Sequence, residues 1–127
     1  MAVNLIAAVG RQGQLGLGGQ LPWHRPEDLK WFRKMTTGTV MVCGRTTYET
    51  IKHLDGTADR TVICQRRDQT CADILVGIDR DVSIVGGATL YKVWLDSGLV
   101  DRSFIAHIDY DGPADVYMPP LWQSVSL

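Results

Sequence analysis

The stretch Val40-Met41-Val42-Cys43-Gly44-Arg45-Thr46-Thr47 has the pattern of an apolar strand that meets a glycine and continues as a helix. The same pattern recurs in Val82-Ser83-Ile84-Val85-Gly86-Gly87-Ala88-Thr89. Ligands of open α/β sheets bind beyond the carboxyl ends of the strands. Helix N-termini there present free N–H groups to phosphate. Two such helix ends can bind a pyrophosphate from opposite sides. Neither motif is a complete GxGxxG, however. A tight turn alone can explain Gly44, and it explains the Gly86-Gly87 pair about as well as close approach to a ligand does.

Other apolar runs predict the rest of the sheet. We expect strands at residues 3–9, 39–43, 61–64, 73–76, 82–85 and 100–108. We expect helices that begin at Pro26, span residues 45–52, and span residues 89–95 before Gly98. Residues 10–19 hold five glycines and predict a loop. Strands that alternate with short helices indicate an α/β fold with a mostly parallel sheet.

Length and composition narrow the class of protein. The chain has 127 residues, which predicts one domain over residues 1–127, and its 45% hydrophobic and 21% charged residues are ordinary globular values. The formal net charge of −1 argues against a nucleic-acid partner. No apolar run approaches the length of a membrane span, and we expect no membrane partner.

Cysteine and histidine usage predicts a cytoplasmic protein without a metal site. The three cysteines, Cys43, Cys64 and Cys71, form no CxxC motif and are expected to be free thiols, as in a reducing compartment. The N-terminus has no signal-peptide pattern. The three histidines have no metal-ligand spacing.

One acidic residue stands among aromatic residues in the stretch Leu21-Pro22-Trp23-His24-Arg25-Pro26-Glu27-Asp28-Leu29-Lys30-Trp31-Phe32. An ionised carboxylate in apolar surroundings is costly unless it is paired. Asp28 therefore suits a flat, cationic ligand that donates hydrogen bonds. The alternative is that Asp28 only complements the helix dipole from the first turn.

Three arginines follow the predicted strands. Arg45 begins a helix, and Arg66 and Arg67 follow the strand that ends at Cys64. The planar fork of arginine suits phosphate, so their convergence would favour the phosphorylated ribose of NADPH over NADH. An isolated Arg66-Arg67 pair is otherwise a solvated turn.

These motifs together resemble the dihydrofolate reductase family, in the family's order and with near-family spacing over almost the whole chain. The resembling stretches are Asn4-Leu5-Ile6-Ala7-Ala8, Leu15-Gly16, Leu21-Pro22-Trp23, Asp28-Leu29-x-Trp31-Phe32, Gly44-Arg45-x-Thr47-x-Glu49-x-Ile51, Ile84-Val85-Gly86-Gly87-x-x-x-Tyr91 and His107-Ile108-Asp109.

The resemblance implies a dihydrofolate reductase-like fold, in which helices flank a central, mostly parallel β-sheet. It implies that NADPH reduces 7,8-dihydrofolate to 5,6,7,8-tetrahydrofolate, with hydride passing from nicotinamide C4 to pterin C6 and Asp28 assisting protonation of N5. Asp28 would also accept hydrogen bonds from pteridine N3 and the 2-amino group. Trp23 and Leu21 complete the implied catalytic set, on a mobile loop at residues 15–23 that closes over the nicotinamide.

The resemblance also implies the binding residues. Those for substrate are Ile6, Ala7, Asp28, Leu29, Phe32, Ile51 and Arg60, where Arg60 would hold the glutamate tail of folate and its register is ambiguous by one residue. Those for cofactor are Ala8, Leu15, Gly16, Gly44, Arg45, Thr46, Thr47, Arg66, Val85, Gly86, Gly87, Ala88, Thr89, Leu90 and Tyr91.

The sequence departs from the family at three places. Ala106 stands where the family commonly has a threonine that supports the acid, and residues 76–82 are too few for the usual helix. The match ends near Pro119-Pro120-Leu121-Trp122, so the fold is expected to be C-terminally truncated, without the final hairpin. The strand at residues 100–108 would then be an exposed edge open to homodimer formation. Asp101, Arg102 and His107 could instead protect that edge by their charge.

Two other functions are compatible with the same residues. One is a related pteridine or pyrimidine reductase of this fold, against which Asp28 and Trp23 favour folate. The other is a non-catalytic binding or structural subunit, which the missing threonine and hairpin suggest and which the retained Asp28, Trp23 and Gly86-Gly87 oppose.

Overall fold

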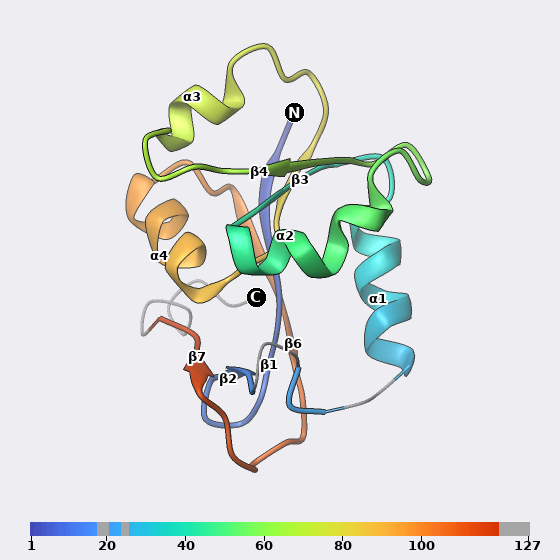
Figure 1. Ribbon diagram of the computed structural model, residues 1–127, viewed down its shortest axis with the longest axis vertical. Coiled ribbons are helices and arrows are strands. Elements are labelled where there is room, and N and C mark those ends of the chain that lie inside the picture. The colour runs from blue at the N-terminus through green and yellow to red at the C-terminus, as the bar shows by residue number, and fades with distance from the viewer. Residues whose placement is uncertain (18–20, 24–25, 120–127) are drawn as a thin grey trace.

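A five-stranded parallel sheet in the order β4-β3-β5-β1-β6 forms the centre of the computed structural model (Figure 1), which describes residues 1–17, 21–23 and 26–119. Its strands are β1 (Val3–Val9), β3 (Val40–Cys43), β4 (Thr61–Cys64), β5 (Val82–Ile84) and β6 (Arg102–His107). The helices are α1 (Pro26–Thr36), α2 (Arg45–Ile51), the 3-10 turn η1 (Lys52–Leu54), α3 (Cys71–Leu75) and α4 (Ala88–Ser97).

Helices cover both faces of the sheet, because consecutive strand residues point to opposite sides. Leu5 belongs to a core cluster with Ile74 of α3 and Trp94 of α4. Ile6, the next residue, belongs to a second cluster that includes Phe32 of α1. The inner strand β3, between β4 and β5, is buried along its whole length. This arrangement explains why the strands are nearly continuous apolar runs.

A second, two-stranded sheet lies at the end of the molecule opposite α3 (Figure 1). It pairs β2 (Gln14–Gly16) with β7 (Val116–Tyr117) in antiparallel fashion. The expectation that residues 10–19 are wholly loop was therefore wrong at β2. The remainder of that stretch beyond Leu17 lies outside the described residues.

Most of the expected strands and helices are confirmed, but one expected strand is a helix. Two strands, at residues 3–9 and 61–64, have the expected bounds, and Gly98 ends α4 with a left-handed φ of 74°. The strand expected at residues 73–76 is wrong, because α3 (Cys71–Leu75) includes all of this segment except Val76. The Thr70 side chain caps the Asp73 amide, and the Asp73 side chain accepts from the Thr70 amide, which nucleates a helix there.

The strand β6 lies at one edge of the described sheet and pairs with β1. The edge position expected for this strand is thus confirmed within the described residues, and Arg102 and His107 are exposed there. The end of the family match, at Pro120 and beyond, lies outside them. Across residues 1–17, 21–23 and 26–119, no helix has the length and apolar character that a membrane crossing needs.

Candidate active site

A cleft of about 1600 Å³ opens where the carboxyl ends of the strands meet the helices. Its wall includes Ala8 near the end of β1, Gly44 after β3, Gln65 after β4 and Gly86 after β5. The helices α1, α2 and α4 contribute to the wall, as do the strands β2 and β7 and the segments that follow β2 and β4. Apart from Arg60, every residue that the sequence suggested for catalysis, substrate or cofactor lines this cleft.

The two glycine motifs meet at the floor of the cleft. The Gly44 amide donates to the Gly86 carbonyl oxygen at 2.8 Å, so the ends of β3 and β5 are joined. Gly86 has a φ of 129°, and a Cβ built there would lie 3.2 Å from Thr47 Oγ1. The backbone can approach a ligand closely only because this position has no side chain. We call the backbone surface formed by Gly44, Gly86 and Gly87 the glycine cradle. Because these residues have no side chains, the cradle fits a pyrophosphate group.

Both helices that start at the cradle have glycine N-caps. Gly44 precedes α2 and Gly87 precedes α4, and neither helix has a side-chain cap. The first amides of these helices thus have no capping side chain and are suited to an anionic ligand.

Tyr91 ties α4 to β1 behind the cradle. Its hydroxyl donates to the Ile6 carbonyl oxygen at 2.8 Å, and its side chain is buried. Burial raises the pKa of Tyr91 well above its ordinary value, so the hydroxyl stays a donor. Tyr91 therefore fixes the position of α4 relative to the strand that carries Ile6 and Ala7.

Asp28 lies in the first turn of α1 and lines the same cleft. Its Oδ2 atom is buried, and the aromatic side chains of Trp23 and Phe32 line the same space. Trp23 is 8% exposed and packs on Tyr110 with ring centroids 5.5 Å apart. Its Nε1 is buried and has no hydrogen-bond partner within the described part of the chain. A bound molecule or water can accept this N–H.

The three arginines converge on one cleft. Arg45 at the start of α2, and Arg66 and Arg67 after β4, all contribute to its wall. Arg66 Nε also lies 3.1 Å from Asp68 Oδ1 in an ion pair whose side chains are mostly exposed. Together with the glycine cradle, these cationic side chains fit the phosphates of a dinucleotide.

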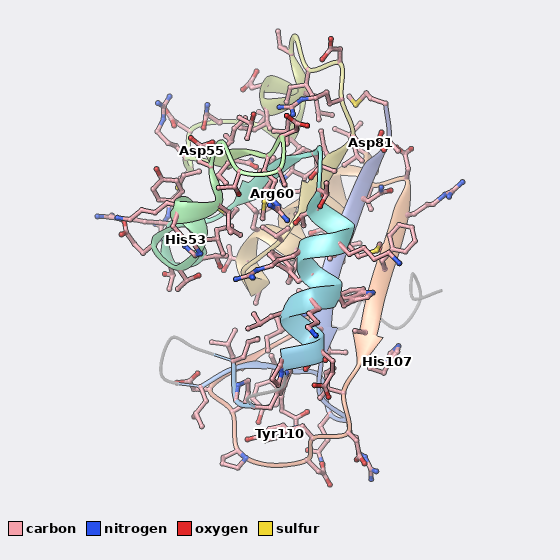
Figure 2. All side chains as sticks on the ribbon, turned by 90° about the vertical axis from the view of Figure 1, so that its right-hand side faces the viewer. His53, Asp55, Arg60, Asp81, His107 and Tyr110 are labelled. Atoms are coloured by element: carbon pink, nitrogen blue, oxygen red, sulfur yellow. The ribbon has the colours of Figure 1, made fainter. Side chains whose placement is uncertain are left out.

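Arg60 is not brought to the cleft. It is 7% exposed, its Nε donates to Thr36 Oγ1 at 3.1 Å, and its NH2 group donates to the Arg33 carbonyl oxygen at 2.8 Å. Figure 2 shows it beside the C-terminal end of α1. Here the guanidinium links α1 to the segment before β4, and the sequence motif alone could not indicate this packing.

Other lining residues carried no motif that assigned them to the site. They are Pro26, Tyr48, Thr50, Cys64, Gln65, Gln69, Val93 and Val116. Gln65 could have been found from its place after a predicted strand. Val116 could not, because β7 has only two residues and depends on its pairing with β2.

Ala106 of β6 pairs with Ala8 of β1 and offers no hydroxyl. It shares a strand face with Phe104, which packs in the α1-side cluster. Among the residues that the structure describes, no group of three or more His, Cys, Asp or Glu side chains is arranged to hold a metal ion.

Comparisons with known proteins agree with one another. A family model described as dihydrofolate reductase matches residues 2–126. The dihydrofolate reductase of Buchnera aphidicola subsp. Acyrthosiphon pisum is 28% identical over 98% of this chain and 86% of its own length. That of Staphylococcus aureus is 32% identical over 94% of this chain and 79% of its own.

A solved structure shares the fold. The dihydrofolate reductase from Enterococcus faecalis, complexed with NADP(H) and RAB-propyl, aligns with a TM-score of 0.80 and 26% sequence identity. The alignment covers 96% of this chain and 80% of that one. The mostly parallel sheet flanked by helices is thus the arrangement seen in that enzyme.

Proposed function

This chain belongs to the dihydrofolate reductase family and is an NADPH-dependent oxidoreductase that reduces dihydrofolate, and we propose that Asp28 assists the protonation of its substrate. The observation that carries the proposal is that Asp28 and the glycine cradle at Gly86 line one and the same cleft. When bound, NADPH supplies a hydride, and the protein supplies alignment and electrostatics.

Asp28 holds the pterin end of the substrate in this proposal. Its carboxylate accepts two parallel hydrogen bonds from ring N3 and the 2-amino group, which is a strong and directional arrangement. The same carboxylate favours protonation at N5, directly or through water near Trp23. The partial burial of Asp28 and the aromatic wall of Trp23 and Phe32 support this role.

The apolar wall positions the two reactants. Ile6, Ala7 and Phe32 flank the pterin, while Leu29 and Ile51 contact the benzoyl part of folate. Leu21 and Trp23 exclude water from the reacting atoms. Arg60 as a contact to the glutamate tail would require its guanidinium to leave the partners at Thr36 and Arg33.

The remaining wall holds the cofactor. The backbone from Val85 to Leu90, with Gly44, Thr46 and Thr47, receives the pyrophosphate, and Tyr91 lies toward the nicotinamide. Arg45 and Arg66 bind phosphate, with Arg66 at the 2′-phosphate. Ala8, Leu15 and Gly16 flank the nicotinamide from the side of β1 and β2.

Asp28→Asn tests the assignment. It keeps the shape of the side chain and removes the charge, so turnover with dihydrofolate at neutral pH should fall roughly 10²-fold or more. NADPH affinity should stay within a factor of about two, because the cradle is untouched. Glu27→Gln, in the same turn and outside the cleft wall, is the matched control. Wild-type turnover in Asp28→Asn would overturn the assignment.

We also propose a homodimer that forms through β6. The strand is an edge of the described sheet, and such edges pair readily with other chains. Sedimentation velocity at micromolar concentration should give a dimer. A monomer over that range would leave β6 as an edge protected by the charges of Arg102 and His107.

Two broader proposals concern organisation and location. We propose that residues 1–127 act as one domain, because the cleft wall takes residues from Ile6 to Val116. Limited proteolysis should give one resistant core.

We propose a cytoplasmic location, because Cys43, Cys64 and Cys71 are all free thiols. Cell fractionation tests it.

A further inference from the structure

A buried hydrogen bond joins α4 to the turn that carries the cleft arginines. Trp94 is completely buried, and its Nε1 donates to Gln65 Oε1 at 2.8 Å. Gln65 is 9% exposed and lies directly after β4, one residue before Arg66. The indole N–H of Trp94 thus ends on the first residue of the arginine turn, which we define as residues 65–69.

Gln65 forms hydrogen bonds through both polar atoms of its side-chain amide and through its backbone amide. Its Nε2 donates to the Gln69 carbonyl oxygen at 3.2 Å, which closes the turn. Its amide donates to the Cys43 carbonyl oxygen at 2.9 Å, which holds it to the end of β3. Each of these bonds has a buried or partly buried partner, where hydrogen bonds are costly to lose.

Arg66 and Gln69 are also hydrogen-bonded to each other within the turn. The Gln69 side chain accepts from the Arg66 amide at 2.8 Å, and the Gln69 amide donates to the Arg66 carbonyl oxygen at 3.1 Å. The ion pair between Arg66 and Asp68 is mostly exposed, and exposed pairs contribute little. The bond from Trp94 to Gln65 is the buried contact that joins this turn to α4.

The helix α4 connects this turn with the glycine cradle. It begins directly after Gly87 at the cradle and carries Trp94 two turns later. Farther along the chain, the Cys71 thiol lies 3.9 Å from the Val93 carbonyl oxygen, so α4 also holds the segment after the turn. One rigid helix thus relates the cradle to the arginines.

We propose that Trp94, acting through Gln65, is a positioning residue that sets the arginine turn against the 2′-phosphate and thereby sets the preference for NADPH over NADH, an inference that rests on the proposed function. NADH has no 2′-phosphate and does not need Arg66 in one place. Loss of the indole N–H should consequently weaken the binding of NADPH more than the binding of NADH.

The variant Trp94→Phe removes the N–H and keeps an aromatic ring. The dissociation constant of NADPH, measured by titration calorimetry without dihydrofolate, should rise roughly tenfold, about the contribution of one hydrogen bond to a charged group. The dissociation constant of NADH should change less than about twofold, because its contacts lie at the cradle. In turnover, KM for NADPH should rise while kcat stays nearly constant.

A second variant separates positioning from stability. Trp94→Phe leaves a buried acceptor on Gln65, whereas the double variant Trp94→Phe with Gln65→Met replaces both partners by apolar groups. Because Gln65→Met also removes the bond to the Gln69 carbonyl oxygen, we expect the double variant to regain only part of the stability lost in urea unfolding and to keep the weakened NADPH affinity. Lys92→Gln, on the exposed side of α4, is the control that should leave the dissociation constants of both NADPH and NADH unchanged.

The contrary results are distinct. Equal weakening of NADPH and NADH, or an NADPH affinity that recovers together with stability in the double variant, would show that Trp94 is only a core residue. A wild-type protein that binds both cofactors equally would also overturn the inference. Selective NADPH binding without turnover of dihydrofolate would instead contradict the proposed function and leave the binding comparison intact.

Discussion

At Gly86 the backbone has a φ of 129°, a conformation that residues with a Cβ rarely adopt. We predict that Gly86→Ala lowers the unfolding free energy by about 1–3 kcal/mol through backbone strain. It should also weaken NADPH binding, because the added methyl would lie 3.2 Å from Thr47 Oγ1 and displace the wall of the cleft there. Urea unfolding and calorimetric titration measure the two effects.

The matched control for Gly86 is Gly56, which has a φ of 79° and no heavy atom within 4 Å of the place that a Cβ would occupy. Gly56→Ala should be strained in the same way and leave the NADPH dissociation constant unchanged. A loss of NADPH affinity in both variants would mean that the cradle at Gly86 has no special part in binding.

The Cys43 thiol should make the unfolding free energy of the protein depend on pH in alkaline solution. Burial, and to a lesser degree the neighbouring Cys64, raises the pKa of the Cys43 thiol from 9.0 to about 12. The unfolded chain releases this proton first, so the unfolding free energy should fall as the pH rises from 9 towards 12. Below pH 9 the contribution is constant. Urea unfolding across this range should show a shallower fall in Cys43→Ala than in wild type, and equal slopes would contradict the assignment.

Single residues were predictable from sequence where a motif fixed them locally. Asp28 follows a proline-initiated helix start, and Gly86 follows a strand, so both were expected in the site. Arg60 illustrates the limit, because its partners Thr36 and Arg33 belong to another element. Packing between elements distant in sequence decides whether such a side chain reaches the cleft.

At the scale of elements, α3 depends on its N-cap. Thr70 Oγ1 accepts from the Asp73 amide at 3.0 Å, and Thr70→Ala removes this bond from a helix of only five residues. The unfolding free energy should fall by about 1 kcal/mol. Asp96→Asn, which breaks an exposed pair with Lys92, should cost less than about 0.5 kcal/mol. Equal losses in urea unfolding would show that the cap is not significant.

The sequence indicates a strand where the structure has α3. The run Ile74-Leu75-Val76 is apolar and too short for its periodicity to separate strand from helix. The reciprocal bonds between Thr70 and Asp73 decided the outcome. The strands β2 and β7 were missed for a different reason, because each is short and exists only through its pairing with the other.

At the scale of the whole molecule, the cleft couples cofactor binding to folding. Its wall takes residues from β1 to β7, so the unfolded chain cannot keep the site. NADPH at 100 times its dissociation constant should add about 2.7 kcal/mol to the unfolding free energy. Differential scanning fluorimetry should show a rise in Tm of several degrees, and a smaller rise with NADH at the same concentration. Equal shifts would contradict the preference for the phosphorylated cofactor.

The order of the motifs along the chain was enough to predict the parallel sheet, because each strand and helix has a local signal. The cleft followed, since the carboxyl ends of parallel strands meet at one edge. The bond between Gln65 and Trp94 was beyond prediction, because its partners lie 29 residues apart and neither belongs to a motif.

The most direct test of the account is to follow deuterium from NADPH labelled at nicotinamide C4 into the product. A cleft that aligns the cofactor over the pterin held by Asp28 predicts that label from only one face of the nicotinamide appears at C6 of tetrahydrofolate. The product can be examined by NMR for each of the two labelled cofactors. Label from both faces, or no label at C6, would contradict alignment of the two reactants in this cleft.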